Sequence, residues 1–80
     1  MSIDIATVER LMRRYWDTEK VKPEELRSVA VEILKLAKQG SSLEIFKSEL
    51  SHMQVNRLRQ TLDSRACEDI ATRVFSAAHA

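Results

Sequence analysis

The chain has 80 residues, of which 44% are hydrophobic and 31% charged, the balance of a folded soluble domain rather than of a disordered segment. Thirteen basic and twelve acidic side chains give a net charge of +1, so no long-range field draws it toward nucleic acid or an anionic membrane. The sequence has no signal-peptide pattern and no run of the roughly 18 apolar residues that a membrane span needs. The lone cysteine, Cys67, cannot form an internal disulfide, and we expect a single domain in the cytoplasm.

The first expected helix covers about residues 4–16. Its apolar side chains recur in steps of three and four residues, which places them on one helix face. These side chains are Ile5, Val8, Leu11, Met12 and Tyr15. Ser2 or Asp4 can cap the helix by accepting a hydrogen bond from a free backbone amide. Trp16 lies just off the apolar face at the helix end, and we predict that it anchors an interface.

The second expected helix covers residues 23–39, between the single proline and the single glycine of the chain, Pro23 and Gly40. Proline suits the first turn of a helix, and glycine suits the position just past its end. One broad face is apolar and is formed by Leu26, Val29, Ala30, Ile33, Leu36 and Ala37. Val31 lies well outside that face and Leu34 lies at its edge. We therefore predict that both belong to an interface, with a second copy or with another protein.

A short third helix is expected over residues 42–50, directly after the glycine. Ser41-Ser42-Leu43-Glu44 has the spacing of a capping box, in which a serine oxygen and a glutamate each satisfy a free amide of the first turn. Three apolar side chains then follow in helical steps and are expected to face inward: Leu43, Phe46 and Leu50.

The C-terminal part carries an apolar residue at about every fourth position. These residues are Val55, Leu58, Leu62, Ala66, Ile70, Val74 and Ala77. Ser51-His52-Met53-Gln54 has the spacing of a second capping box, so helices over residues 52–63 and 64–78 are expected, or one continuous helix. Four-residue steps drift around an ordinary helix, which favours a break or kink at Asp63-Ser64. If the last helix is displaced, Val55 joins the predicted interface.

These elements predict an all-α fold with four helices, or five if the last is broken, in a small antiparallel bundle or helical array. A domain of this size buries only roughly 60–65% of the surface that its unfolded chain exposes. Small helical domains compensate for this by association, and we predict a homodimer.

Catalytic and metal-binding patterns are weak. His52, His79 and Cys67 lack the spacing of metal ligands, and adjacent carboxylates such as Glu24 and Glu25 suit the first turn of a helix. A single glycine is too few for a phosphate-binding loop. We expect no metal, no cofactor and no enzymatic activity.

Residues 42–63 also have the outline of a helix-turn-helix. Four polar side chains of this pair could reach bases or phosphates: Gln54, Asn56, Arg57 and Arg59. The details fit poorly, because His52 takes a turn position that is normally apolar and Arg57 falls where an inward apolar residue is needed. A dimeric DNA-binding or nucleoid-associated regulator is therefore the alternative interpretation.

The preferred interpretation is a small cytoplasmic regulator or adaptor of bacterial type, such as an antiactivator or a secretion-chaperone-like protein. It would act by helix-face binding to a protein partner, with apolar anchors for affinity and rim charges for specificity. The residues predicted for this interface are Trp16, Val31, Leu34 and Val55.

Overall fold

The structure is a computed structural model that describes residues 3–40 and 42–79, and all regular structure in these two ranges is helical. The four α-helices are α1 (Ile5–Tyr15), α2 (Pro23–Gln39), α3 (Leu43–Met53) and α4 (Ser64–Ala78). A 3-10 turn, η1 (Thr18–Lys20), follows α1, and a π-helical segment, η2 (Gln54–Leu58), continues α3. The predicted all-α fold with four helices is confirmed for this part of the chain.

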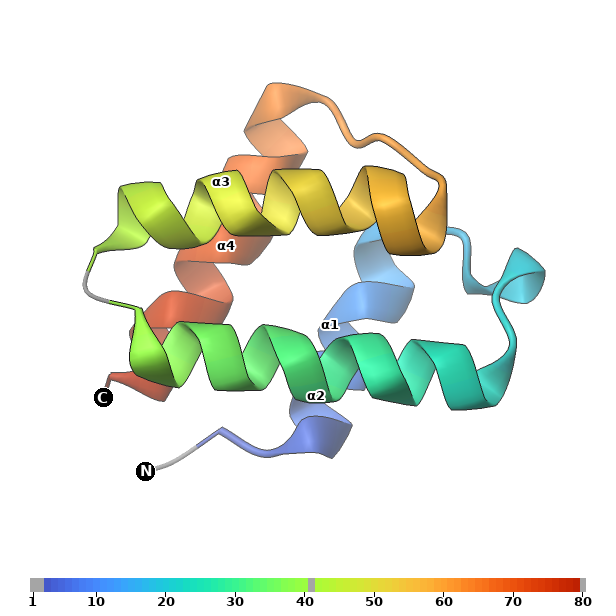
Figure 1. Ribbon diagram of the computed structural model, residues 1–80, viewed down its shortest axis with the longest axis horizontal. Coiled ribbons are helices and arrows are strands. Elements are labelled where there is room, and N and C mark those ends of the chain that lie inside the picture. The colour runs from blue at the N-terminus through green and yellow to red at the C-terminus, as the bar shows by residue number, and fades with distance from the viewer. Residues whose placement is uncertain (1–2, 41, 80) are drawn as a thin grey trace.

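Two antiparallel helices, α2 and α3, lie side by side and form one layer of the molecule (Figure 1). The other two helices, α1 and α4, cross behind that layer, and both pack against α2. The molecule measures 31 × 24 × 17 Å along its principal axes. Each helix of the front layer therefore has one side against the molecule and one side turned outward.

Local capping signals set most of the helix starts. Asp4 caps α1 by accepting hydrogen bonds from the backbone N of Thr7 at 2.8 Å and from its hydroxyl at 2.7 Å. Asp63 caps α4 through the backbone N of Ala66 at 2.8 Å. Pro23 occupies the first turn of α2, as predicted. Ser2, the other predicted cap of α1, lies outside the described residues.

The start of α3 differs from the predicted capping box. Ser42 is the N-cap, and its hydroxyl accepts from the backbone N of Ile45 at 3.2 Å. Ile45 therefore holds the position where a capping box needs a glutamate, and the serine that would pair with Glu44 is Ser41, which lies outside the described residues.

The helix break predicted around Ser51 is absent, because α3 continues through this position into η2. The chain leaves the helix at Arg59, whose φ of 56° and ψ of 34° are left-handed. Continuing the helix buries Met53 and Leu58, and this packing outweighs the local capping signal. The break expected at Asp63-Ser64 is present but is longer, and it spans residues 59–63.

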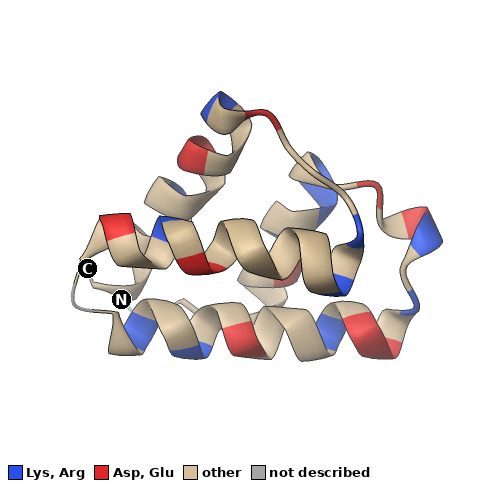
Figure 2. Ribbon diagram, turned by 45° about the horizontal axis from the view of Figure 1, so that its top comes forward, with Lys and Arg blue, Asp and Glu red and all other residues tan. Residues whose placement is uncertain are grey.

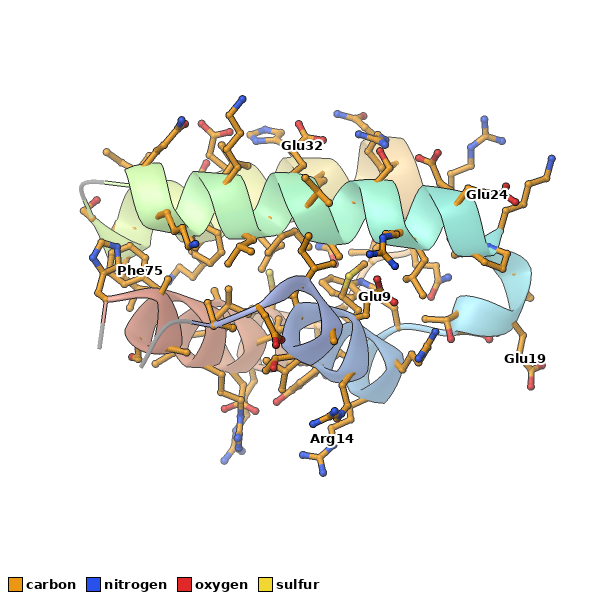
Figure 3. The ribbon with its side chains drawn as sticks, turned by 90° about the horizontal axis from the view of Figure 1, so that it is seen from below. Glu9, Arg14, Glu19, Glu24, Glu32 and Phe75 are labelled. Atoms are coloured by element: carbon orange, nitrogen blue, oxygen red, sulfur yellow. The ribbon has the colours of Figure 1, made fainter. Side chains whose placement is uncertain are left out.

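The core is built from all four helices, and its side chains fill the space between α2 and the helices behind it (Figure 3). Twelve side chains that the periodicity predicts to face inward are buried: Val8, Met12, Leu26, Val29, Ala30, Ile33, Ala37, Phe46, Leu50, Leu58, Ile70 and Val74. Ile3, Trp16, Met53 and Ala71 are buried as well. Burying each large side chain stabilises the fold by about 1.5–3 kcal/mol.

Gly40 ends α2 with a φ of −63° and a ψ of 132°, a conformation open to any residue. Its role is close packing, because a Cβ at this position would lie 3.0 Å from the backbone O of Leu36 and 3.4 Å from Cε1 of Phe75. The Phe75 ring also stacks on His79, with 4.3 Å between ring centroids, and His79 Nε2 lies 2.8 Å from the backbone O of Ala37. The glycine thus lets the C-terminal ends of α2 and α4 meet.

We expect Gly40→Ala to lower the free energy of unfolding by about 1 kcal/mol. The smaller entropy of the unfolded chain favours alanine by about 0.4–1 kcal/mol, but overpacking costs about 1–3 kcal/mol. Urea denaturation monitored by circular dichroism measures the difference. Gln39→Ala, one residue earlier on the exposed surface, serves as the control, and a Gly40→Ala protein at least as stable as wild type would contradict this account.

Candidate functional site

The outer side of α3 and η2 carries two of the three large hydrophobic side chains that are exposed in the described residues. Ile45 and Val55 are each 52% exposed. Ser48 and His52 lie between them in sequence, are exposed too, and complete a stripe with helical spacing along one side of the helix. We call these four residues the α3 face. The sequence predicted Val55 for an interface only if the last helix is displaced; α4 packs against α2 and α3, and Val55 is nevertheless exposed. The sequence did not single out Ile45.

A hollow of about 180 Å³ lies at one end of the α3 face, where α2 ends and α3 begins. Its walls are formed by Leu36, Gln39, Gly40, Ile45, Phe46 and Glu49. The hollow is partly apolar and opens beside the exposed Ile45, so it can accept an apolar side chain of a bound partner.

The outer side of α2 carries the third exposed hydrophobic residue, Val31, which is 44% exposed. Leu34, at the edge of the core, is half-buried. Both residues thus lie outside the buried face of α2, as the sequence predicted. The exposed side chains on the same side of the helix as Val31 are Ser28 and four charged residues, Glu24, Arg27, Lys35 and Lys38.

Trp16, predicted as an interface anchor, lies inside the molecule and is 3% exposed. It is the residue after α1 and has an extended backbone, with a φ of −110° and a ψ of 152°. Because Trp16 lies beyond the end of α1, helical periodicity does not predict the direction of its side chain. Its Nε1 donates a hydrogen bond to Oε1 of Gln54 at 3.2 Å.

Gln54 is the one buried polar residue of the described chain and is 2% exposed. Its Oε1 accepts a second hydrogen bond, from the backbone N of Leu62 at 3.0 Å. Gln54 therefore holds the end of α1 and the 59–63 loop together, and it does not lie on the surface where it would contact nucleic acid.

A second glutamine strengthens the same junction. Gln60 accepts a hydrogen bond at Oε1 from the backbone N of Asp17 at 2.9 Å, and its Nε2 donates to the backbone O of Asp17 at 2.6 Å. The loop after η2 is thus fixed to the segment after α1 by two side-chain amides.

Arg57, the central residue of the nucleic-acid alternative, is held against α2. Its Nε donates to Glu25 at 2.8 Å, and its two terminal nitrogens contact Glu32 at 2.6 Å and Ser28 at 3.0 Å. The hydrogen bond to Glu25 raises the pKa of Arg57 above its ordinary value. The guanidinium is therefore engaged within the chain.

The two-helix outline of residues 42–63 is also absent, because α3 and η2 form one continuous helical segment that ends at Leu58. Among the polar residues predicted to reach bases or phosphates, Asn56 and Arg59 are exposed. Gln54 and Arg57 are bound to other parts of the molecule.

A groove of about 470 Å³ runs between α3 and the start of α4, and Cys67 lies at its wall. Cys67 is 6% exposed, and this burial raises the pKa of its thiol, which keeps it protonated and weakly nucleophilic at neutral pH. Within residues 3–40 and 42–79, no set of three or more His, Cys, Asp or Glu side chains is arranged to hold a metal ion.

Tyr15 joins α1 to α4 by donating a hydrogen bond from its hydroxyl to the carboxylate of Asp69. The same carboxylate accepts from Nε of Arg73 at 3.3 Å. The hydrogen bond with Asp69 raises the pKa of Tyr15, and it lowers the pKa of Asp69. These three side chains satisfy one another, which is typical of a structural contact.

Comparison of the chain with protein-family models, with curated proteins and with solved structures finds no match. None of the helices in the described ranges is long and apolar enough to cross a bilayer.

Replacing Gln54 with leucine should lower the free energy of unfolding by about 2–4 kcal/mol. Trp16 Nε1 and the backbone N of Leu62 would lose their acceptor, and each donor left unpaired in the interior costs about 1–3 kcal/mol. The chain has one tryptophan, so urea denaturation followed by its fluorescence measures the loss with a probe at this site. Asn56→Leu, an exposed position nearby, is the control. A Gln54→Leu protein within about 0.5 kcal/mol of wild type would refute the role given to this amide.

Tyr15, the single tyrosine of the chain, should ionise above its ordinary pKa of about 10, and Asp69→Ala should lower that pKa. Because the pKa of Tyr15 is raised by folding, this contact stabilises the fold below the ordinary pKa. The contribution is lost as pH rises through the raised value. Ultraviolet absorbance of the tyrosinate measures the titration, with the exposed Thr72→Ala as control. Equal midpoints for Asp69→Ala and wild type would show that the hydrogen bond has no such effect.

Proposed function

We propose that the protein is a small non-enzymatic regulator or adaptor of bacterial type, which acts by binding another protein through a helix face. The observation that carries this proposal is the α3 face, where Ile45 and Val55 are both half exposed on a helix whose other side is buried. Single exposed apolar residues are common on soluble proteins, but here two share one stripe beside a hollow.

The shape and charge of this surface fit a partner helix. Apolar residues of an incoming helix would meet Ile45 and Val55, and one of them would enter the adjoining hollow. Glu44 and Glu49 are exposed on either side of the stripe, so basic residues at the edges of the partner helix would be favoured. The polar side chains of Ser48 and His52 in the middle keep the surface soluble when no partner is bound, as a reversible regulator requires.

We also propose a homodimer that forms through α2, the other helix of the front layer. Val31 and Leu34 on α2 supply apolar surface that no described element covers completely. With α2 used for self-association, the α3 face is left for a foreign partner. The protein would then present two copies of one binding surface.

DNA binding has weaker support. Arg57 is held by two carboxylates and Gln54 is buried, which leaves Asn56 and Arg59 of the residues named for that alternative. Breaking the contacts of Arg57 would leave Glu25 and Glu32 without their partner. The protein-binding proposal requires no such rearrangement.

A double substitution, Ile45→Asp with Val55→Asp, should reduce capture of the partner protein at least tenfold. Each carboxylate would lose its hydration in the bound state, and burial of two apolar side chains worth about 1.5–3 kcal/mol each would be lost. The measurement is quantitative pull-down with tagged wild-type and variant proteins. Thr72→Asp, on the exposed side of α4, is the control. Equal recovery of the same partner by the double variant and wild type would show that the α3 face is not the binding surface.

A further inference from the structure

We infer that two copies of this chain pair through their α2 helices, which run antiparallel across a two-fold axis at Val31. The inference rests on the homodimer of the proposed function and gives that dimer its surface and orientation. Three features support this pairing: the position of Val31, the side of α2 on which it lies, and the charges around it.

Val31 is the central residue of α2, which covers Pro23–Gln39 and has 17 residues. In a two-fold dimer, a surface patch meets its own copy, and a residue on the axis contacts the same residue of the partner. An exposed apolar side chain at the midpoint of a helix fits this position, because the midpoint is where the two helices would cross the axis and bury each other's side chains.

The side of α2 that carries Val31 is turned away from the rest of the molecule. Ser28 and Glu32 lie toward η2, since both contact Arg57. Val31 is rotated by about 60° from Ser28 and about 100° from Glu32, in the same direction and away from η2. The buried residues of α2 lie on its opposite side and are Leu26, Val29, Ala30, Ile33 and Ala37. The side of α2 that carries Val31 is therefore exposed to a second copy.

The outer side of α2 carries Arg27 in its first half, and Figure 2 shows a basic position close to the acidic N-terminal end of α2 as well as basic positions near its C-terminal end. Of the other charges on this side, Glu24 lies in the first turn, and Lys35 and Lys38 lie in the second half. All three are exposed, and none forms an ion pair with a described residue. By contrast, Glu25 and Glu32, which lie toward η2, are both paired with Arg57.

Antiparallel pairing about Val31 makes these charges complementary. Glu24 and Lys38 are equally far from Val31 in sequence, so each Glu24 would lie level with Lys38 of the other copy, with Lys35 one turn nearer the centre. Parallel pairing would place like charges together. Arg27 and Lys35 are also equally far from Val31, but they lie about 40° to either side of it, so their side chains flank the contact without meeting.

The test compares the full chain and three charge variants by sedimentation equilibrium over a concentration series. Glu24→Lys alone, and Lys35→Glu with Lys38→Glu alone, should each weaken dimerisation at least tenfold, because like charges would then meet across the axis. An equimolar mixture of these two variants should dimerise within about threefold of wild type, since opposite charges face each other again. Glu19→Lys, which changes the net charge as Glu24→Lys does but lies on η1, should leave the dimer unchanged. Circular dichroism verifies the fold of each variant.

A second variant tests the axis without altering charge. Under mild oxidation, Val31→Cys should form a disulfide-linked dimer, whereas Val55→Cys on the α3 face should not, and the native Cys67 is buried. A linked Val55→Cys dimer with an unlinked Val31→Cys protein would overturn the inference.

The remaining outcomes separate the pairing from the proposed function. A wild-type chain that stays monomeric at millimolar concentration overturns the dimer and this inference, while the Ile45 and Val55 pull-down still decides partner binding. A stable dimer that none of the charge variants weakens, or two weakened variants that do not associate when mixed, overturns the α2 pairing and leaves the dimer on another surface.

Discussion

The buried amide of Gln54 is the contact on which the arrangement of this fold depends. One carbonyl oxygen accepts from Nε1 of Trp16 and from the backbone N of Leu62, and so it joins the end of α1, the end of α3 and the loop before α4. Trp16 is buried, and the hydrogen bond of the Leu62 backbone N is partly buried. A polar group left unpaired in the interior costs about 1–3 kcal/mol. No apolar side chain could replace this oxygen as an acceptor, which explains why a polar side chain is buried at this position.

The consequences reach both surfaces of the front layer. With Gln54 held inside, α3 extends through η2 without a break, and Arg57 is brought onto α2, where Glu25 and Glu32 hold it. This contact joins α2 to η2, in addition to the packing of the core. Their outward sides, with Val31 on one and Val55 on the other, are fixed in direction as a result. Polar contacts therefore contribute, together with the core, to the directions of the proposed binding surfaces.

Helix periodicity was enough to predict the fold and most of the core, because steps of three and four residues place Val29, Ile33 and Phe46 inward irrespective of the partner helix. It also left Val31 outside the apolar face, whereas it counted Val55 with the apolar residues of the C-terminal part and assigned it to the interface only if the last helix is displaced. It failed at Trp16, which follows the last helical residue and so has no helical face. Sequence reasoning failed again at Gln54, because a glutamine can serve either in a capping box or as a buried amide. Only its contacts with Trp16 and Leu62, which are distant in sequence, distinguish these two roles.

The contrast between paired and unpaired charges says more about binding than the net charge of +1 does. The carboxylates of α2 that lie toward η2, Glu25 and Glu32, find a partner within the chain, whereas Glu24, Lys35 and Lys38 on the outward side find none among the described residues. Exposed ion pairs contribute at most about 1 kcal/mol each, so the fold gains little from pairing those charges internally. Across a two-fold axis the same charges select one orientation over the other, and this gives an otherwise weak apolar contact at Val31 a defined geometry.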